Sequence, residues 1–483
     1  MPESELKNKT AKGLFWGGMS NGVQQLLNLF FGIFLARLLS PGDYGMVGML
    51  AIFSGIAASL QEAGFISALI NRKEDRHEDY NAVFWFSICM SFCLYWILFF
   101  FAPLIARFFH TPELTKLSRY VFIGFFISSF GVSQRAYMAK HLKVKQQAIA
   151  YITAILCYGT VGVIMAYKGY AYWGIATQSL VYIFVVTSMF WLFSPWRPSL
   201  KISMRPIREM FPFSCKMLIT NVFNYINSNV FSVILGRFYS KDEVGDYTQA
   251  NKWDFMGFSL IQGMVSSVSQ PVLASVNDER ERQLRIFRKM VRFTAFVSFP
   301  AMFGLSLIAP EFITIAITDK WMESAQILQI LCIAGAFVPI CNLFSSLLVS
   351  KGRSAIHMWS FVILGVLQLA IMVAIHSLGI RTMVIVYTAI NILWLFVWYW
   401  FVRKETGYRF WHLAMDILPY LFITMVVMVV TYLMTKPIDN IYCLLAAKIA
   451  IAAALYVLIM RLSNAVTFKE AANFFKQRII RNN

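Results

Sequence analysis

Long apolar stretches follow one another along almost the whole chain, from near Gly13 to near Met460. Each is about as long as a helix that crosses a bilayer, which needs about 20 residues within a range of about 17–25. Charged residues, proline and glycine separate the stretches. The pattern predicts an all-α, polytopic membrane protein with about 14 transmembrane helices. The predicted spans are 13–38, 44–69, 81–104, 117–138, 147–167, 171–193, 211–236, 245–270, 287–309, 323–348, 355–377, 381–402, 413–435 and 439–460.

Composition supports this fold class and excludes most others. Hydrophobic residues make up 58% of the chain and charged residues 14%, whereas soluble proteins average about 45–50% and about 25%. No polar segment of domain size interrupts the spans. The chain therefore has no room for a soluble catalytic domain, and we expect no enzymatic activity.

Other sequence signals also point away from processing, disulfides and metals. The segment Met1–Lys12 is polar and leads into the first span without a small-residue cleavage site, so we expect that span to be retained. All seven cysteines fall inside apolar stretches and the six histidines are scattered. A disulfide framework or zinc site would place such residues at short recurrent spacings. We expect no metal and no cofactor.

The distribution of basic residues predicts the orientation. If the N-terminus is cytoplasmic, 29 of the 43 lysines and arginines fall in cytoplasmic segments and 10 on the opposite side. This asymmetry follows the positive-inside rule and places both termini in the cytoplasm. The net charge of +19 is spread over many short cytoplasmic segments, which suits anionic membrane lipids and argues against nucleic acid.

A segment near the start is repeated about two hundred residues later. Residues 31–45 read FGIFLARLLSPGDYG and residues 231–245 read FSVILGRFYSKDEVG. Both copies start on the predicted cytoplasmic side, which indicates a parallel duplication of a transporter type. The predicted domains are a lobe of helices 1–6 (1–193), a cytosolic linker that lies at the membrane surface (194–210), a lobe of helices 7–12 (211–402), and helices 13–14 with a basic cytosolic tail (403–483).

Each repeat carries a stripe of polar residues near the middle of its first span. The stripes are Asn21, Gln24, Gln25 and Asn28 in the first copy, and Asn221, Asn224, Tyr225 and Ser228 in the second. One interpretation is hydrogen bonding between helices. The equal depth of the two stripes favours a shared wet cavity, whose amide groups could donate to and accept from sugar hydroxyls. Gln249 adds a further polar group on the eighth span.

A few charged residues lie within the spans, where each costs about 2.5–3.5 kcal/mol on insertion scales and needs a reason. Lys216 and Lys252 could meet a phosphate in the cavity or extend to the nearer interface. Glu62 and Asp254 are the candidate acids for ion coupling, with pairing to a lysine as the alternative. Arg135 is expected to anchor the fourth span at the interface, and Lys448 has no evident partner.

Several segments resemble the bacterial polysaccharide flippases of the O-antigen translocase and colanic acid exporter type. GLFWGGMSNGVQQLLNLFFGIFLARLLSPGDYGMVGM resembles their first two helices, and FPFSCKMLITNVFNYINSNVFSVILGRFYSKDEVGDYTQANKW resembles helices 7 and 8. FPAMFGLSLIAPEFITIAITDKWMESAQILQIL resembles their helix 9–10 region, including the Lys320-Trp321 pair. The resemblance covers most of the chain and weakens after about residue 400.

The resemblance implies a two-lobed multidrug/oligosaccharidyl-lipid/polysaccharide (MOP) exporter fold in the bacterial inner membrane. It implies that an undecaprenyl-diphosphate-linked oligosaccharide moves from the cytoplasmic to the periplasmic leaflet by alternating access. In such a flippase Lys216 and Lys252 would face the diphosphate. The implied partners are this lipid-linked oligosaccharide and membrane lipids, with H⁺ or Na⁺ as coupling ion and a polysaccharide polymerase and chain-length regulator as protein partners.

Two other classes of protein are alternatives to a flippase. A cation-coupled multidrug exporter of the same fold would need a set of buried acids, for which only Glu62 and Asp254 are candidates. An O-antigen polymerase or ligase would need a sizeable periplasmic loop. The longest predicted outer loops, near Arg107–Lys116 and Glu311–Met322, look too short for that role.

Overall fold

The computed structural model describes residues 3–463 and 468, apart from residues 63, 73, 75, 202, 277 and 278. All regular elements in this part of the chain are helices. The chain divides into two compact units, Met1–Gly245 and Asp246–Asn483. Each unit is described below by itself.

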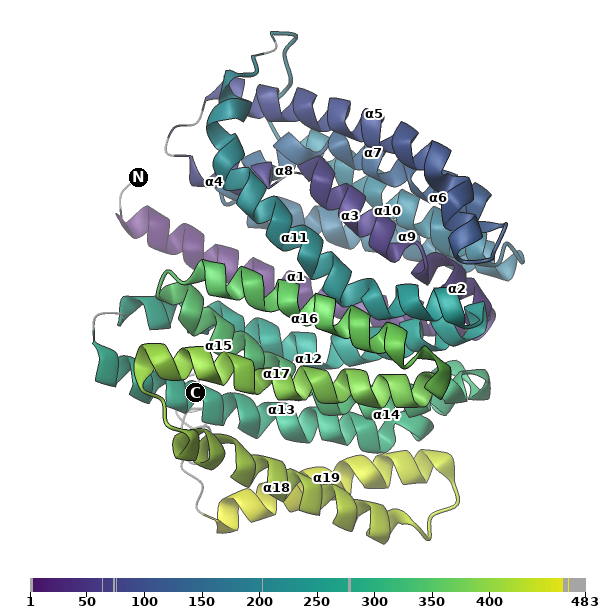
Figure 1. Ribbon diagram of the computed structural model, residues 1–483, viewed down its shortest axis with the longest axis vertical. Coiled ribbons are helices and arrows are strands. Elements are labelled where there is room, and N and C mark those ends of the chain that lie inside the picture. The colour runs from purple at the N-terminus through teal and green to yellow at the C-terminus, as the bar shows by residue number, and fades with distance from the viewer. Residues whose placement is uncertain are drawn as a thin grey trace. The chain divides into compact units, whose positions relative to one another are not determined.

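The first unit is a bundle in which α9 packs between α1 and α10, and α11 packs against α3, α4 and α5 (Figure 1). Trp196, Tyr80 and Phe84 belong to one of its buried cores, at the end of the bundle where α4 and α5 meet. Its helices are α1 (Glu3–Leu38), α2 (Pro41–Gly48), α3 (Ala51–Glu62), α4 (Phe65–Asn71), α5 (His77–Phe108), α6 (Leu114–Val121), α7 (Ile123–Ser129), α8 (Val132–Lys140), α9 (Val144–Tyr167), α10 (Tyr172–Phe193), α11 (Arg205–Phe238) and the start of α12 (Lys241–Ser275).

The second unit is built around α13, which packs against α14, α15, α18 and α19. It holds the rest of α12 and the elements α13 (Arg280–Ile317), η1 (Asp319–Trp321), α14 (Met322–Gly335), α15 (Val338–Ser350), α16 (Ser354–Ala374), η2 (His376–Leu378), α17 (Ile380–Thr406), α18 (Phe410–Thr435) and α19 (Ile441–Leu462).

The polytopic helical fold is confirmed. Eleven segments of the described chain are long and apolar enough to cross a membrane. The three other predicted spans, 13–38, 117–138 and 245–270, are also helical, in α1, α6–α8 and α12. None of the three is among the eleven segments, so the total of fourteen stays a prediction. The predicted lobe boundaries likewise stay a prediction.

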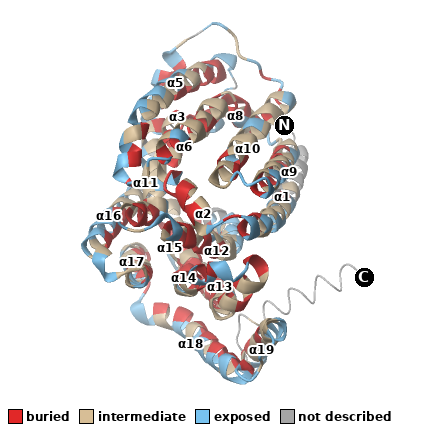
Figure 2. Ribbon diagram, turned by 90° about the vertical axis from the view of Figure 1, so that its right-hand side faces the viewer, coloured by how far each residue is buried: buried red, intermediate tan, exposed pale blue. Residues whose placement is uncertain are grey.

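The outward faces of the helices carry large apolar residues, as expected for surfaces that meet lipid. On α5, Phe92, Trp96, Phe100 and Leu104 follow one another every fourth residue, and all four are exposed. Figure 2 shows the exposed positions along the outer sides of helices such as α5, with buried positions turned toward neighbouring helices. A stripe with this spacing lies on one helix face.

The structure corrects the predicted boundaries at several spans. The predicted span 44–69 is broken into α2, α3 and α4, and Gly64 adopts a left-handed conformation (φ 72°) at the second break. The predicted span 117–138 is three short helices, and 323–348 is divided before Pro339. Helix α13 continues to Ile317, beyond the predicted end at residue 309. Glu311, predicted in an outer loop, is therefore inside a helix.

Candidate functional site

The two copies of the repeat adopt the same local structure at the end of α1 and of α11. Each helix is followed by a serine that caps the next helix: Ser40 Oγ donates to Asp43 Oδ2 at 2.7 Å, and Ser240 Oγ donates to Glu243 Oε2 at 2.9 Å. The backbone amide of each acid residue bonds back to its serine. These capping boxes fix where α2 and α12 begin, and they explain why Ser and the acid recur at the same offsets.

The glycines of the repeat lie where the two copies approach each other. A Cβ atom on Gly45 would be 1.8 Å from the carbonyl oxygen of Lys241, and one on Gly245 would be 1.8 Å from that of Pro41. The relation is reciprocal, as expected for two copies related by a pseudo-twofold axis. Only glycine permits so close a backbone approach.

The polar stripe of α1 is partly engaged in hydrogen bonds within the first unit. Gln24 Nε2 donates to Ser20 Oγ at 2.8 Å, and Asn28 Oδ1 accepts from the hydroxyl of Tyr158 on α9. Asn21 is exposed and Gln25 half-buried. Asn28 therefore joins two helices, and the shared wet cavity stays a prediction for the stripe.

The stripe of α11 also divides between packing and exposure. Tyr225 packs against Gly55 of α3, where an added Cβ atom would lie 2.4 Å from the tyrosine ring. Ser228 Oγ donates to the carbonyl oxygen of Asn224 at 2.8 Å. Asn221 and Asn224 are half-buried. The side chain of Lys216 lies outside the described residues.

The polar residues predicted on α12 lie in the second unit. Gln249 is fully buried, and neither its amide nitrogen nor its amide oxygen has a hydrogen-bond partner in the described part of the chain. Asp254 is 6% exposed and its Oδ1 atom is also without a hydrogen bond there. The backbone of α14 comes close, since a Cβ atom on Gly335 would lie 2.4 Å from Asp254 Oδ1. Lys252 is half-buried.

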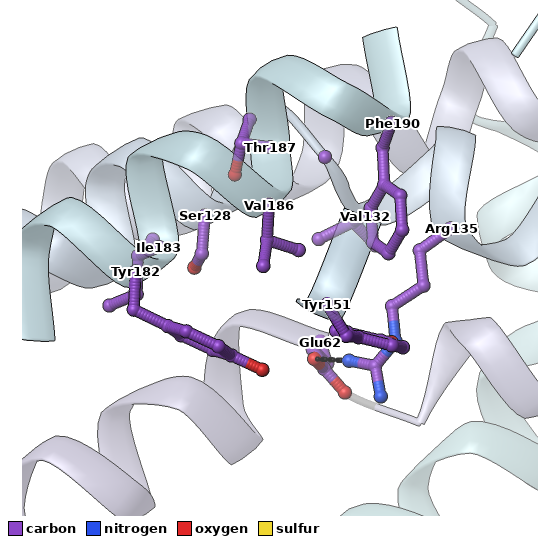
Figure 3. Close-up of a pocket in the computed structure, with 11 residues that line it drawn as sticks. Glu62, Ser128, Val132, Arg135, Tyr151, Tyr182, Ile183, Val186, Thr187 and Phe190 are labelled. Atoms are coloured by element: carbon purple, nitrogen blue, oxygen red, sulfur yellow. Dashed lines mark hydrogen bonds and ion pairs between the residues drawn. The ribbon is translucent and has the colours of Figure 1, made fainter. Parts of the chain in front are cut away.

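Glu62 is paired with an arginine in place of the lysine predicted as its alternative partner. Arg135 Nη1 lies 3.0 Å from Glu62 Oε1, and the expected role of Arg135 as an interface anchor stays a prediction. The pair borders a cavity of about 220 Å³ inside the first unit, with Tyr151 of α9 and Tyr182 of α10 on its walls (Figure 3). Sequence reasoning missed the tyrosines. The signal that was present is the pair of opposite charges in two nearby spans, since each charge needs a partner.

Lys448 also has a partner that the sequence did not reveal. Its Nζ atom lies 2.6 Å from Glu311 Oε1 on α13 and donates to the carbonyl oxygen of Leu307 at 3.2 Å. Both charged side chains are buried. Lys448 lines an apolar cavity of about 570 Å³ between α13, α18 and α19. The ion pair joins α19, the last helix in the described part of the chain, to α13 at the centre of the second unit.

Comparison with known proteins identifies the family. A family model described as "Polysaccharide biosynthesis protein" matches residues 34–326, more than half of the chain. The lipopolysaccharide biosynthesis protein WzxC of Escherichia coli (strain K12) is 24% identical over 354 residues, which cover 72% of this chain and 71% of WzxC.

Solved structures show the same fold. The lipid II flippase MurJ in an inward closed conformation has a TM-score of 0.74 at 16% identity, over 96% of this chain and 100% of MurJ. An inward-facing multidrug resistance MATE family transporter of the MOP superfamily has a TM-score of 0.65 at 18% identity, over 80% of this chain and 94% of that protein. The chain is thus a multi-pass membrane protein with the MOP transporter fold, and it belongs to the polysaccharide biosynthesis protein family.

Proposed function

We propose that this protein is a flippase that moves an undecaprenyl-diphosphate-linked oligosaccharide across the bacterial inner membrane, for the synthesis of lipopolysaccharide, capsule or exopolysaccharide. The observation that carries the proposal is the pair of uncharged polar stripes on α1 and α11, in a chain of the polysaccharide biosynthesis family. Amides and hydroxyls at mid-span suit a ligand rich in hydroxyl groups. A glycan needs such a path because hydrocarbon cannot satisfy its polar groups.

Transport would follow alternating access, with both termini cytoplasmic and the ligand loaded from the cytoplasmic side. Asn21, Gln24, Gln25, Asn221, Asn224 and Gln249 would contact the glycan, and Lys252 and Lys216 the diphosphate. Of the two candidate coupling acids, Asp254 suits H⁺ or Na⁺ best, because it is buried and joined by no ion pair in the described part of the chain. Glu62 already pairs with Arg135.

A deletion of the gene in its native bacterium tests the proposal. We expect loss of the surface polysaccharide together with accumulation of lipid-linked repeat units, detected in labelled lipid extracts. The accumulated units should resist a glycosidase added to spheroplasts and become sensitive in inverted membrane vesicles. Loss of polysaccharide without such cytosol-facing units would contradict a flippase.

The same strain separates the alternative functions. A multidrug exporter of this fold would leave surface polysaccharide unchanged and alter resistance to cationic drugs, which we expect to stay as in the parent. Loss of a polymerase or ligase would instead leave translocated single units on the periplasmic face. For the site, Lys252→Ala should reduce export while Lys252→Arg retains it, and normal export in a well-expressed Lys252→Ala protein would remove Lys252 from the site.

A further inference from the structure

The cavity beside Glu62 and Arg135 lies wholly within the first unit, at two interrupted helices. Glu62 is the last residue of α3, before the break at Gly64, and Arg135 is in the first turn of α8, after the break at Gly131. Transporters place ligand sites where membrane helices are discontinuous. Under the predicted orientation, both residues lie toward the cytoplasmic ends of their spans.

The ion pair faces open space. The side chains of Glu62 and Arg135 are 35% and 47% exposed, and Figure 3 shows both at the edge of the cavity. Their charges cancel, so a free cation or anion would have to displace one partner from the other. The guanidinium nevertheless has further N–H donors, and the carboxylate has a second oxygen. A neutral ligand that both donates and accepts could bind to the pair without breaking it.

The remaining walls combine aromatic rings, hydroxyls and aliphatic side chains. Tyr151, Tyr182 and Phe190 supply rings, Thr187 supplies a hydroxyl group, and Val186 lies between them. A sugar ring has the matching surface, because its hydroxyls project around the rim and its two faces expose C–H groups. The hydroxyls around the rim of a sugar ring can form charge-assisted hydrogen bonds with an ion pair. The C–H faces of the sugar ring can pack on aromatic side chains.

The size of the cavity limits the ligand. Its volume of about 220 Å³ is that of about seven water molecules at roughly 30 Å³ each. One hexose ring with its hydroxyls fits such a space, and a longer glycan would have to extend out of it. The ion pair is exposed on one side, which leaves room for the rest of the glycan chain to extend outward.

We infer that this cavity is a binding subsite for one neutral monosaccharide residue of the transported glycan. The inference rests on the proposed function and deepens it, because it assigns part of the substrate's specificity to the first unit. Arg135 and the hydroxyl group of Tyr182 donate to the sugar hydroxyls, Glu62 accepts from them, and the ring of Tyr151 binds a face of the sugar.

Saturation-transfer NMR on the purified full-length protein in lipid nanodiscs tests the subsite. The probes are the neutral monosaccharides from acid hydrolysis of the native bacterium's own surface polysaccharide, as methyl glycosides, with methyl glucuronide and inorganic phosphate as anionic comparisons. We expect saturation of the ring C–H protons of at least one neutral glycoside at millimolar concentration. Val186→Phe, which fills the cavity, should abolish the signal, and Arg135→Gln should weaken binding at least tenfold.

Matched variants separate a binding role from a structural one. Tyr182→Phe removes one hydroxyl in the cavity and should weaken binding, whereas Tyr167→Phe removes one from a side chain that is 83% exposed and should not. Glu62→Gln should bind better than Glu62→Leu. All variants are compared as monodisperse protein by size-exclusion chromatography, and Tyr182→Phe keeps the test open if Val186→Phe fails to fold.

The subsite is overturned if no neutral glycoside is saturated, if the signal survives in both Val186→Phe and Arg135→Gln, or if only the anionic probes bind. These outcomes are distinct from failure of the flippase proposal. A deletion strain that keeps its surface polysaccharide would refute the flippase whatever the NMR shows. Export that is normal in cells with no sugar binding would refute the subsite alone.

Discussion

At the scale of single residues, the buried Lys448–Glu311 pair provides a sharp test of the second unit. Removing one member of a buried ion pair leaves the other charge uncompensated, at a cost of about 3–5 kcal/mol. We expect Lys448→Met to lower the stability of the purified protein by about that amount. The double variant Lys448→Met with Glu311→Gln should recover most of the loss, because no charge is left buried. The measurement is the thermal unfolding of detergent-solubilised protein.

An exposed pair in the same unit is the matched control. Arg381 and Glu323 are 3.8 Å apart and 59% and 62% exposed, so Arg381→Met should change stability by less than about 1 kcal/mol. Equal effects of Lys448→Met and Arg381→Met would show that burial of the first pair contributes nothing.

Replacement of Gln249 should have opposite effects on stability and on transport. Its amide is fully buried without a hydrogen-bond partner in the described part of the chain, and an unsatisfied buried polar group costs about 1–3 kcal/mol. Gln249→Met, which fills the same space without polar atoms, should therefore raise thermal stability. If Gln249 contacts the glycan during transport, the same variant should lower polysaccharide export. A less stable Gln249→Met protein with normal export would contradict both parts.

At the scale of elements, Asn81 makes two of the hydrogen bonds that hold the linker between α10 and α11, and Trp85 Nε1 donates a third to the carbonyl oxygen of Ser199. Asn81 of α5 accepts from the backbone amide of Ser199 at 2.8 Å and donates to the carbonyl oxygen of Lys201 at 2.7 Å. Asn81→Leu leaves both backbone groups without these bonds, at a cost of about 1–3 kcal/mol. Local opening of the linker should increase accordingly, and trypsin should cut after Lys201 about tenfold faster in inverted membrane vesicles.

Ser199→Ala is the control for this variant. The Ser199 hydroxyl contacts only the exposed ring of His77 among the described residues, at 3.3 Å, so its loss leaves the Asn81 contacts in place. We expect cleavage at the parent rate. If Ser199→Ala and Asn81→Leu were cut equally fast, Asn81 would not be what holds the linker.

The elements show which parts of a fold hydrophobic patterning can predict. Apolar runs located the eleven segments that are long and apolar enough to cross a membrane, because such a helix must present enough apolar surface to lipid. The breaks escaped prediction, since backbone groups freed near Gly64 and Pro339 can be satisfied by neighbouring helices that are distant in sequence. The repeat was readable because its serines, acids and glycines have local roles as caps and close contacts. Capping acts within four residues and is visible in the sequence itself.

At the scale of the whole molecule, the sequence predicted the candidate residues better than their partners. Glu62 and Asp254 were recognised because a charge within a span is rare. The partner of Glu62 is 73 residues away and that of Lys448 is 137 residues away, and no pattern along the chain connects them. The cavity beside Glu62 depends on five helices, so its tyrosines could not be distinguished from other membrane tyrosines by sequence alone.

The number of spans is the last property of the whole molecule that needs an experiment, and three segments decide it. The segments α1, α6–α8 and α12 are helical but are not among the eleven strongly apolar spans. If each crosses the membrane, the residues that flank it lie on opposite sides. Single cysteines can be placed in a cysteine-free background at the flanking pairs Ser4 and Leu38, Thr111 and Leu142, and Lys241 and Glu279.

We expect a membrane-impermeant maleimide to label cysteines at Leu38, Thr111 and Lys241 in cells with a permeable outer membrane, and those at Ser4, Leu142 and Glu279 only after the inner membrane is opened. Tyr170 and Lys201, which flank the strongly apolar α10, serve as outside and inside references. Labelling of one flanking pair from the same side would mean that its helix does not cross. The basic residues beyond it would then move to the periplasmic side, against the asymmetry that fixed the orientation, unless a second helix also failed to cross. The predicted orientation therefore requires an even number of spans with both termini in the cytoplasm. This requirement is stricter than the prediction that any single helix crosses the membrane.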